Sequence, residues 1–408
     1  MSIKTRSKKT RRLSYSLAIN EALHQMMEQD ESVILIGQGV KSPWYVGNTA
    51  QGLVKKFGEQ RVIDTPVSEN AMTGAAVGAS LAGMRAVVVH PRMDFMLYAF
   101  DPIVNEAANW YYMSGGKVPV PVVFWGIINR GGEQAAQHSQ ALHAMFSHAP
   151  GLKVVMPGTA YDAKGLMVAA IQEDNPVVFI DDRWLYNTED DVPEELYSVP
   201  IGKGIVRREG KDVSIIASSY MVGEALKAAL ILEVSGVDVE VVDLRTVKPL
   251  DIELILMSVE KTGRAVVVDT GWKTCGLAAE VSAVISENNI GCLKSPIRRV
   301  TLPDIPAPAS RSLEEKYYIG SKNVVDVRRI WQGEKWYMAH RSHFYQRMTN
   351  LGMSHQKVTI LELLTVAVSC AAATGYLGFD FPGRVIVVIA VLSGFIAGGI
   401  WVIYKVRT

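Results

Sequence analysis

The stretch DTPVSENAMTGAAVGASLAGMRAVVV, residues 64–89, contains the pattern that decides the fold. An extended segment ends near a proline, a run of small residues suited to a helix follows over residues 71–83, and residues 86–89 are apolar and mostly β-branched. This order predicts a strand, a helix and a second strand, the repeating unit of a parallel sheet covered by helices. Gly74 and Gly78 lie four residues apart on the predicted helix, so either the sheet or a second subunit can approach that face closely.

The same alternation continues on both sides of this stretch. Ser14 precedes a helical pattern, and apolar segments typical of buried strands recur at residues 33–36, 120–125, 153–156 and 177–180. After the acidic, proline-containing stretch EDDVPEELYSVP, residues 189–200, a second series has strands at 213–217, 237–244 and 265–269 and helices at 222–233 and 252–261. We therefore expect two α/β domains joined by a linker.

Length and composition limit the class of protein. The chain has 408 residues, which is too many for one ordinary core. A net charge of +1 gives no reason to expect nucleic-acid binding. The three cysteines, Cys275, Cys292 and Cys370, are scattered and cannot build a disulfide framework or paired zinc ligands, which fits a reducing compartment. Residues 1–13 are basic with no apolar stretch behind them, so we expect a flexible tail and no secretory signal.

Two polar side chains stand out as candidates for chemistry. Glu69 lies where the predicted helix of residues 71–83 begins, a place where a carboxylate ordinarily caps the helix. His138 follows a Gly-Gly turn and precedes a helical stretch, a setting in which a lone histidine is more often structural than catalytic. Taken singly, neither residue decides between these interpretations.

Six motifs, taken together, are far more specific than their parts. They are DTPVSEN, YYMSGG, AAQHSQ, APGLKVV, NPVVF and EVVDLRTVKPLD, in this order and spacing. From about Ser14 to Arg329 the chain thereby resembles the beta subunits of pyruvate and branched-chain 2-oxo acid dehydrogenases. The resemblance implies an α/β fold of two transketolase-like domains, a thiamin-diphosphate pyrimidine-binding domain over residues 14–190 and a carboxy-terminal transketolase domain over residues 201–330, with residues 191–200 as linker.

The resemblance also implies roles for single residues. Glu69 matches the glutamate that hydrogen-bonds a ring nitrogen of the cofactor's aminopyrimidine, and we expect its carboxylate to be buried near apolar groups. Phe95 matches the aromatic residue that packs on that ring. His138 matches an active-site histidine that hydrogen-bonds substrate and assists acyl transfer to lipoyl. A structural potassium ion is implied at four backbone carbonyls, those of Ala170, Ile171, Glu173 and Asn175.

The sequence departs from the family pattern at two places. Members commonly have Gly-Glu-Glu after the first strand, where this chain has Gly37-Gln38-Gly39, so Gln38 takes the position expected to contact the cofactor. Many pyruvate-type members have arginine where this chain has Trp125, although Arg130 lies nearby. Both departures bear on the substrate and on the proton relay beside the cofactor.

A diphosphate-binding motif is missing. The family expectation is a Gly-Asp-Gly followed by asparagine, and the sequence contains no Gly-Asp-Gly. A diphosphate needs a bound cation with oxygen ligands. The resemblance therefore implies a separate alpha subunit that supplies the Mg²⁺ site within an α2β2 heterotetramer, and a lipoyl acyltransferase as further partner.

Three functions remain open on the sequence alone. The first is decarboxylation of a pyruvate-like 2-oxo acid with acyl transfer to a lipoyl carrier. The second is a split transketolase or acyloin-forming synthase that uses the same cofactor without a lipoyl carrier, which Gln38, Gly39 and Trp125 keep open. The third is an inactive membrane scaffold for an alpha subunit, which the presence of Glu69, Phe95 and His138 disfavours.

The carboxy-terminal segment is not explained by the family. Val385–Tyr404 is 20 residues long without a charge, long enough to cross a bilayer, and residues 331–357 are basic and aromatic. We therefore expect a juxtamembrane segment over residues 331–357 and a two-helix membrane hairpin over residues 358–405, with a buried soluble hairpin as the alternative. Positive flanks on both sides predict catalytic domains in the cytoplasm, anchored to the inner membrane, with both termini cytoplasmic.

Overall fold

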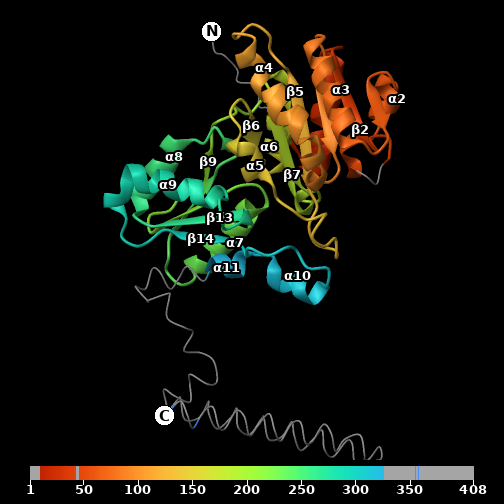
Figure 1. Cartoon of the computed structure of the whole chain (residues 1–408). Helices are drawn as coiled ribbons and strands as arrows, with labels where there is room; N and C mark the ends of the chain where they lie inside the picture. Colours follow the sequence, from red (N-terminus) through yellow and green to blue (C-terminus); the bar gives the residue numbers. More distant parts are fainter. Residues whose placement is uncertain (1–9, 43–45, 326–353, 355–356, 358–408) are drawn as a thin grey trace, which may run out of the picture. The chain divides into compact units, whose positions relative to one another are not determined.

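The first domain is built on a mostly parallel sheet whose strands, apart from β12, alternate with helices along the chain. The computed structural model describes residues 10–42 and 46–325, besides residues 354 and 357 (Figure 1). Within the described chain the sheet has seven strands in the order β12-β6-β7-β5-β4-β2-β3. Their bounds are β2 (Val33–Gln38), β3 (Val62–Thr65), β4 (Arg85–His90), β5 (Val122–Ile128), β6 (Lys153–Val155), β7 (Val177–Asp182) and β12 (Thr246–Lys248).

Helices cover both faces of this sheet because strand side chains alternate between two apolar cores. Ile34 and Val88 face one core together with Ala76 of α3, whereas Leu35 and Val87 face the other, which α1 and α6 cover. The helical segments are α1 (Tyr15–Gln29), η1 (Gly47–Ala50), α2 (Leu53–Phe57), α3 (Glu69–Leu81), η2 (Met93–Ala99), η3 (Asp101–Ala107), α4 (Ala108–Met113), α5 (His143–His148), α6 (Ala160–Gln172) and η4 (Arg183–Leu185).

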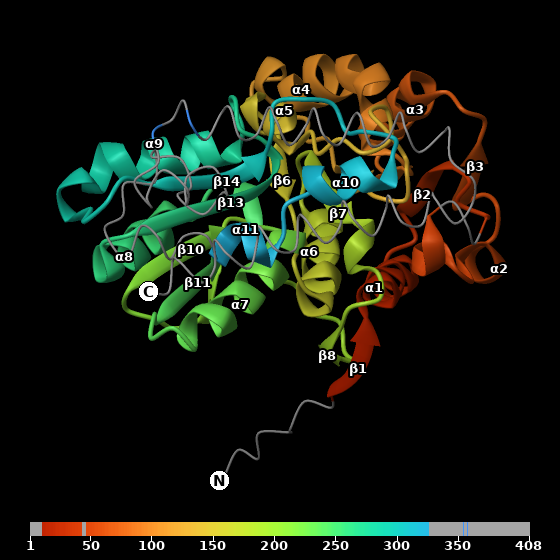
Figure 2. The same ribbon diagram turned by 90° about the horizontal axis from the view of Figure 1, so that it is seen from below.

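The second domain repeats this architecture on a smaller scale. Its described sheet has five strands in the order β14-β13-β10-β11-β9, all parallel except β9. Helix α11 packs beside α7 (Figures 1 and 2). The elements are β9 (Ile205–Arg208), β10 (Val213–Ala217), α7 (Tyr220–Glu233), β11 (Val239–Asp243), α8 (Ile252–Thr262), β13 (Ala265–Trp272), α9 (Leu277–Asn289), η5 (Ile290–Cys292), β14 (Arg298–Leu302), α10 (Arg311–Tyr317) and α11 (Ser321–Val325).

Two segments that the sequence predicted as irregular pair with each other as strands. Residues of the basic tail form β1 (Thr10–Ser14), which runs antiparallel to β8 (Glu189–Pro193) from the acidic stretch taken for a linker (Figure 2). Opposite charges support this pairing, because Arg12 forms an ion pair with Glu189 of β8 at 3.7 Å and Arg11 forms one with Glu194, just after β8, at 3.8 Å. The prediction of a flexible tail is therefore wrong for residues 10–13.

Strand β12 crosses from the second domain into the sheet of the first. It pairs antiparallel with β6, an arrangement that local sequence pattern did not predict. At the end of β12, Lys248 Nζ donates hydrogen bonds to the carbonyl oxygens of Ser147 (2.8 Å) and Ala149 (2.7 Å). The fully buried side chains of His143 and Asp269 also meet across the domains, with Nε2 2.9 Å from Oδ1. Both domains thus belong to one compact unit.

The prediction of a fold that includes a transmembrane hairpin is corrected. Two α/β domains are present as expected, but across residues 10–42 and 46–325 no helix combines the length and apolar character needed to cross a membrane. The predicted juxtamembrane segment and hairpin, residues 331–405, lie almost wholly outside the described residues. The cytoplasmic location of the catalytic domains stays a prediction.

Candidate active site

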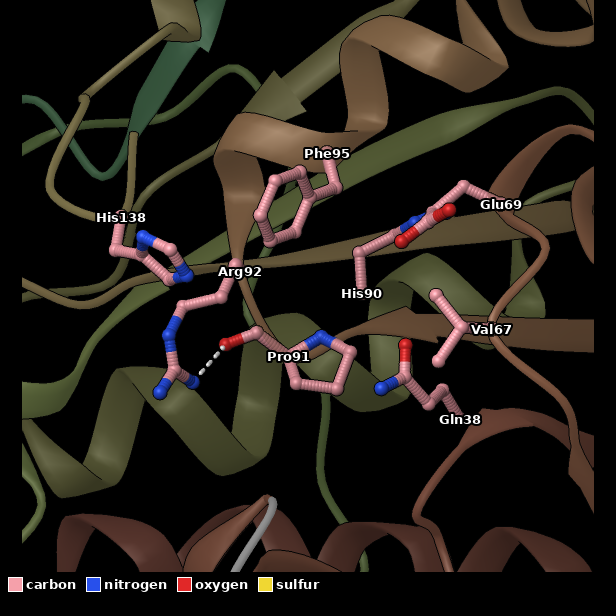
Figure 3. Close-up of a pocket in the computed structure, with 8 residues that line it drawn as sticks. All are labelled: Gln38, Val67, Glu69, His90, Pro91, Arg92, Phe95 and His138. Carbon is pink, nitrogen blue, oxygen red and sulfur yellow. Dashed lines mark hydrogen bonds between the residues drawn. The ribbon is translucent and has the colours of Figure 1, made fainter. Parts of the chain in front are cut away.

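A cavity of about 470 Å³ lies at the carboxyl ends of β2 and β4. In open parallel sheets this edge is where ligands bind, since loops at the strand ends present side chains toward one place. Figure 3 shows side chains from β2, β4, α3, η2 and the loop after β5 around the cavity. The lining residues are Gln38, Val67, Glu69, His90, Pro91, Arg92, Phe95 and His138.

Glu69 contributes a carboxylate to one wall of the cavity. It occupies the first turn of α3, where the amide groups at a helix amino terminus favour negative charge. The Ser68 side chain, which precedes it, makes no capping hydrogen bond. The Glu69 side chain is only partly buried in this chain, contrary to the expected burial near apolar groups, because this wall of the cavity is open.

Phe95 and His138 both line the cavity, and their rings pack against each other. Their ring centroids lie 5.3 Å apart with the planes nearly perpendicular, the edge-to-face arrangement that aromatic rings favour (Figure 3). Phe95 is in η2, whereas His138 is in the loop between β5 and α5. Four of the residues that the sequence singled out, Gln38, Glu69, Phe95 and His138, therefore line one cavity.

Two further polar residues of this region were missed by sequence reasoning. His90 lies at the end of β4 and is buried, with Nε2 3.2 Å from Thr73 Oγ1 and with Nδ1 lacking a hydrogen-bond partner. Asp94 is also buried, and burial raises its pKa. The family resemblance gave a role to the adjacent Phe95 but none to Asp94. An acidic residue inside an apolar stretch was the available signal for Asp94.

Burial keeps the His90 imidazole neutral. It lowers the pKa of His90 from 6.5 to about 3. The unfolded chain therefore binds a proton at His90 below about pH 6.5, whereas the folded chain binds it only below about pH 3. As a result, the free energy of unfolding decreases as the pH drops from about 6.5 to about 3.

We expect His90→Gln to weaken this pH dependence. Between about pH 6.5 and pH 5 the wild type should lose about 2 kcal/mol more unfolding free energy than the variant. Urea unfolding of the full-length chain at several pH values measures this difference. His148→Gln, at an exposed position, is the control and should follow the wild type. Equal pH slopes for His90→Gln and wild type would contradict a neutral buried imidazole.

The residues at the second family departure do not line the cavity. Trp125 is fully buried within β5, where its ring packs edge-on against Phe179 at 6.4 Å. Arg130 is buried in an ion pair with Asp182, and burial lowers its pKa to about 10. Trp125 therefore packs in the core and does not contact a molecule in the cavity, so it can affect substrate choice only through the packing around it.

The carbonyls assigned to potassium lie elsewhere, where α6 ends. The carbonyl oxygens of Ile171 and Glu173 accept hydrogen bonds from the Arg85 guanidinium at 3.0 and 3.1 Å. Carbonyls at a helix carboxyl end lack partners within the helix and attract positive charge, which Arg85 supplies here. The buried Oδ1 of Asn175 has no hydrogen-bond partner.

The cavity fits one half of thiamin diphosphate. Glu69 offers a carboxylate and Phe95 an aromatic face, which suit a planar ring with polar nitrogens. In the described part of the chain, no group of three or more His, Cys, Asp or Glu side chains is placed to hold a metal ion. The chain thus offers a pyrimidine site, and its described residues offer no acidic cluster for the cation of a diphosphate.

Comparison with known proteins identifies the two domains. Residues 11–189 match the family described as transketolase, pyrimidine binding domain, and residues 202–324 match transketolase, C-terminal domain. A solved structure titled split gene transketolase, inactive beta4 tetramer, superimposes with a TM-score of 0.64 at 24% identity, covering 78% of this chain and 98% of that one. At this identity the likeness concerns the fold alone.

Curated relatives are similar over nearly their whole length. The acetoin:2,6-dichlorophenolindophenol oxidoreductase subunit beta of Cupriavidus necator is 45% identical over 317 residues, which span 75% of this chain and 94% of the relative. The pyruvate dehydrogenase E1 component subunit beta of Rickettsia felis is 41% identical over 310 residues, which span 76% and 95%. This chain belongs to the family of thiamin-diphosphate-dependent 2-oxo acid dehydrogenase beta subunits, enzyme subunits that work together with an alpha subunit.

Proposed function

We propose that this beta subunit helps to decarboxylate a small, pyruvate-like 2-oxo acid and to pass the acyl group to a lipoyl carrier. The observation that carries the proposal is the convergence of Glu69, Phe95 and His138 on one cavity. The relative named as a pyruvate dehydrogenase subunit supports this substrate class. When bound, thiamin diphosphate supplies the nucleophilic carbon that attacks the 2-oxo carbonyl and the electron sink that makes loss of CO₂ possible.

Glu69 and Phe95 would hold the cofactor's pyrimidine ring. The Glu69 carboxylate accepts or returns a proton at a ring nitrogen, since its place on the open cavity wall leaves it within reach of a bound ligand. Phe95 packs against the ring and fixes its plane, and Gln38 supplies a neutral amide at the end of β2. The buried, neutral His90 adds a second polar group without adding charge.

His138 and Arg92 would act on the substrate. The His138 imidazole can donate a hydrogen bond from one ring nitrogen to the substrate's carbonyl or hydroxyl oxygen and accept one at the other. Arg92 also lines the cavity, and its guanidinium suits the carboxylate of a 2-oxo acid. His138 is then placed to stabilise the oxygen on which charge develops and to assist departure of the acyl group to the lipoyl carrier.

The partner that completes the cavity would be the alpha subunit. On α3 the sheet-facing side chains are buried, whereas a Cβ added at Gly74 or Gly78 would meet no atom within 4 Å. The small-residue face of this helix is therefore open, as a subunit interface requires. Large exposed side chains in η2 and α4, Tyr98 (74%), Tyr112 (88%) and Met113 (61%), add apolar surface of the kind that subunits bury.

The alpha subunit would also bring the Mg²⁺ and diphosphate site in an α2β2 assembly. This fits the missing Gly-Asp-Gly and the lack of an acidic cluster among the described residues. A potassium ion at the carbonyls of Ala170, Ile171, Glu173 and Asn175 remains a prediction. Two of these backbone carbonyls, those of Ile171 and Glu173, already accept hydrogen bonds from Arg85, and the unpartnered side-chain Oδ1 of Asn175 is a further oxygen outside the predicted set.

A second candidate function is cleavage of acetoin. It is favoured by the 45% identity to a relative named for acetoin. Acetoin is a 2-hydroxy ketone without a carboxylate, so Arg92 would have no anion to bind. The two candidates therefore differ in how much the activity depends on Arg92.

A substrate panel on the reconstituted complex separates these functions. We expect the chain to co-purify with its alpha subunit and the complex to turn over one or more short 2-oxo acids with a lipoyl acceptor. Arg92→Gln should raise KM for a 2-oxo acid about tenfold or more through the lost charged hydrogen bond, and leave KM for acetoin within about twofold. Turnover of acetoin but of no 2-oxo acid would favour the second candidate over the first.

A further inference from the structure

The loop that carries His138 has an unusual backbone. Residues Gly131, Gly132, Glu133 and Ala135 all have left-handed φ angles, of 76°, 64°, 62° and 59°. Glycine adopts this conformation readily, but Glu133 and Ala135 adopt it only where surrounding contacts compensate for the strain. The conformation of the loop that leads to His138 therefore depends on what holds it.

One holding contact comes from the far end of the described chain. Both carboxylate oxygens of Glu314, in α10, accept a hydrogen bond from the backbone N–H of Glu133, at 3.1 and 3.0 Å. Nearby, Tyr318 Oη accepts from the Gly131 N–H at 3.4 Å, and the Glu133 carboxylate accepts from the Arg311 N–H at 3.4 Å. Figure 1 shows α10 beside the lower end of the amino-terminal domain.

Burial strengthens the hydrogen bonds between Glu314 and the Glu133 N–H. Glu314 is 5% exposed, so water scarcely competes for its oxygens, and a hydrogen bond to a carboxylate is stronger than one between neutral groups. It acts on Glu133, which is one of the two strained non-glycine residues of the loop.

The other end of the loop is held by the first domain. Asp94 Oδ1 accepts hydrogen bonds from Gln140, from the backbone N–H at 3.1 Å and from Nε2 at 2.9 Å. His138 lies between these two attachments, and its ring packs on Phe95, the neighbour of Asp94. The two ends of this segment are thus anchored in different domains.

We propose that Glu314 is a positioning residue for His138, through which the carboxy-terminal domain sets the geometry of the active site. The inference rests on the proposed role of His138. Glu314 does not line the cavity, so its effect on catalysis passes through the loop of residues 131–138.

The first test measures the loop itself, without cofactor or alpha subunit. In the full-length chain, Glu314→Ala should raise amide hydrogen exchange of the peptide spanning residues 131–140 by about tenfold or more. Glu314→Gln keeps one acceptor oxygen and should give an intermediate rate. Glu315→Ala, on the same helix with a side chain 69% exposed, should match wild type. Thermal unfolding of each variant verifies that the fold persists, and unchanged exchange in a folded Glu314→Ala would overturn the proposal.

The second test is a double-mutant cycle in the complex with the alpha subunit. Glu314→Ala should lower kcat about tenfold to a hundredfold, with KM within about threefold, because His138 is displaced and not removed. In a His138→Ala background, Glu314→Ala should cost less than about twofold further. Equal effects of Glu314→Ala with and without His138 would show that it acts independently of His138, contrary to the proposal.

The two tests separate this inference from the proposed function. If His138→Ala leaves turnover unchanged, the proposed role of His138 fails, whereas the exchange result still reports on the loop. If His138→Ala abolishes turnover and Glu314→Ala has no effect on either readout, the positioning role alone fails.

Discussion

Replacing Glu69 with glutamine is expected to lower turnover of the complex with its alpha subunit by at least about a thousandfold, a barrier increase of about 4 kcal/mol. Glutamine fills nearly the same volume at the start of α3 but cannot exchange a proton with a ring nitrogen. Assembly and the stability of the fold should change little, since the side chain is only partly buried and caps no other element.

Steady-state turnover of the reconstituted complex measures this loss, with gel filtration to verify assembly. Glu253→Gln is the matched control, because Glu253 also lies in the first turn of a helix, α8. Its side chain is exposed and is not among those that line the cavity. It should behave as wild type. Activity of Glu69→Gln within about tenfold of wild type, less than about 1.4 kcal/mol of barrier, would refute the proposed role of Glu69.

The isolated chain is expected to bind thiamin diphosphate with Mg²⁺ at least about a hundredfold more weakly than the complex does, a difference of about 2.7 kcal/mol. The cavity offers contacts for the pyrimidine ring only, and no acidic cluster for a cation exists among the described residues. In the lone chain the diphosphate would then stay hydrated, because no protein-bound cation replaces its water. The cofactor would lose most of its binding free energy as a result.

Calorimetric titration of the lone chain and of the complex measures the two affinities. Addition of the alpha subunit should restore stoichiometric binding, and Glu69→Gln in the complex should leave the diphosphate contacts in place. Tight, stoichiometric binding to the lone chain at micromolar concentration would contradict the shared site.

Most of the secondary structure was predictable, because strands buried on both faces and small-residue helices leave strong patterns. Val213–Ala217 is apolar except for Ser214, Ala265–Trp272 begins with four apolar residues, and both segments are strands of the second sheet. β1 and β8 escaped prediction since Arg11, Arg12 and their acidic partners look like solvated charge, and only the paired structure reveals their attraction.

The candidate site was predictable where a family motif named its residues. Glu69, Phe95 and His138 lie apart in the sequence and meet at the cavity because their loops leave the same edge of the sheet. Asp94 and Glu314 carry no such motif. Their importance comes from burial and from hydrogen bonds to distant backbone amides, which depend on tertiary structure and leave no periodic signal.

The crossing of β12 has a consequence for how the chain can be divided. A fragment ending in the acidic stretch before residue 200 would leave the backbone of β6 as an open sheet edge, ready to pair with a strand of another molecule. Such a fragment would also lack Asp269, whose carboxylate contacts the buried His143 ring. It would lack Lys248 as well, whose Nζ donates a hydrogen bond to a carbonyl oxygen of α5. The two domains are therefore separate in architecture, but we expect them to fold as one unit. A stable truncation has to end after the second domain and not between the two domains.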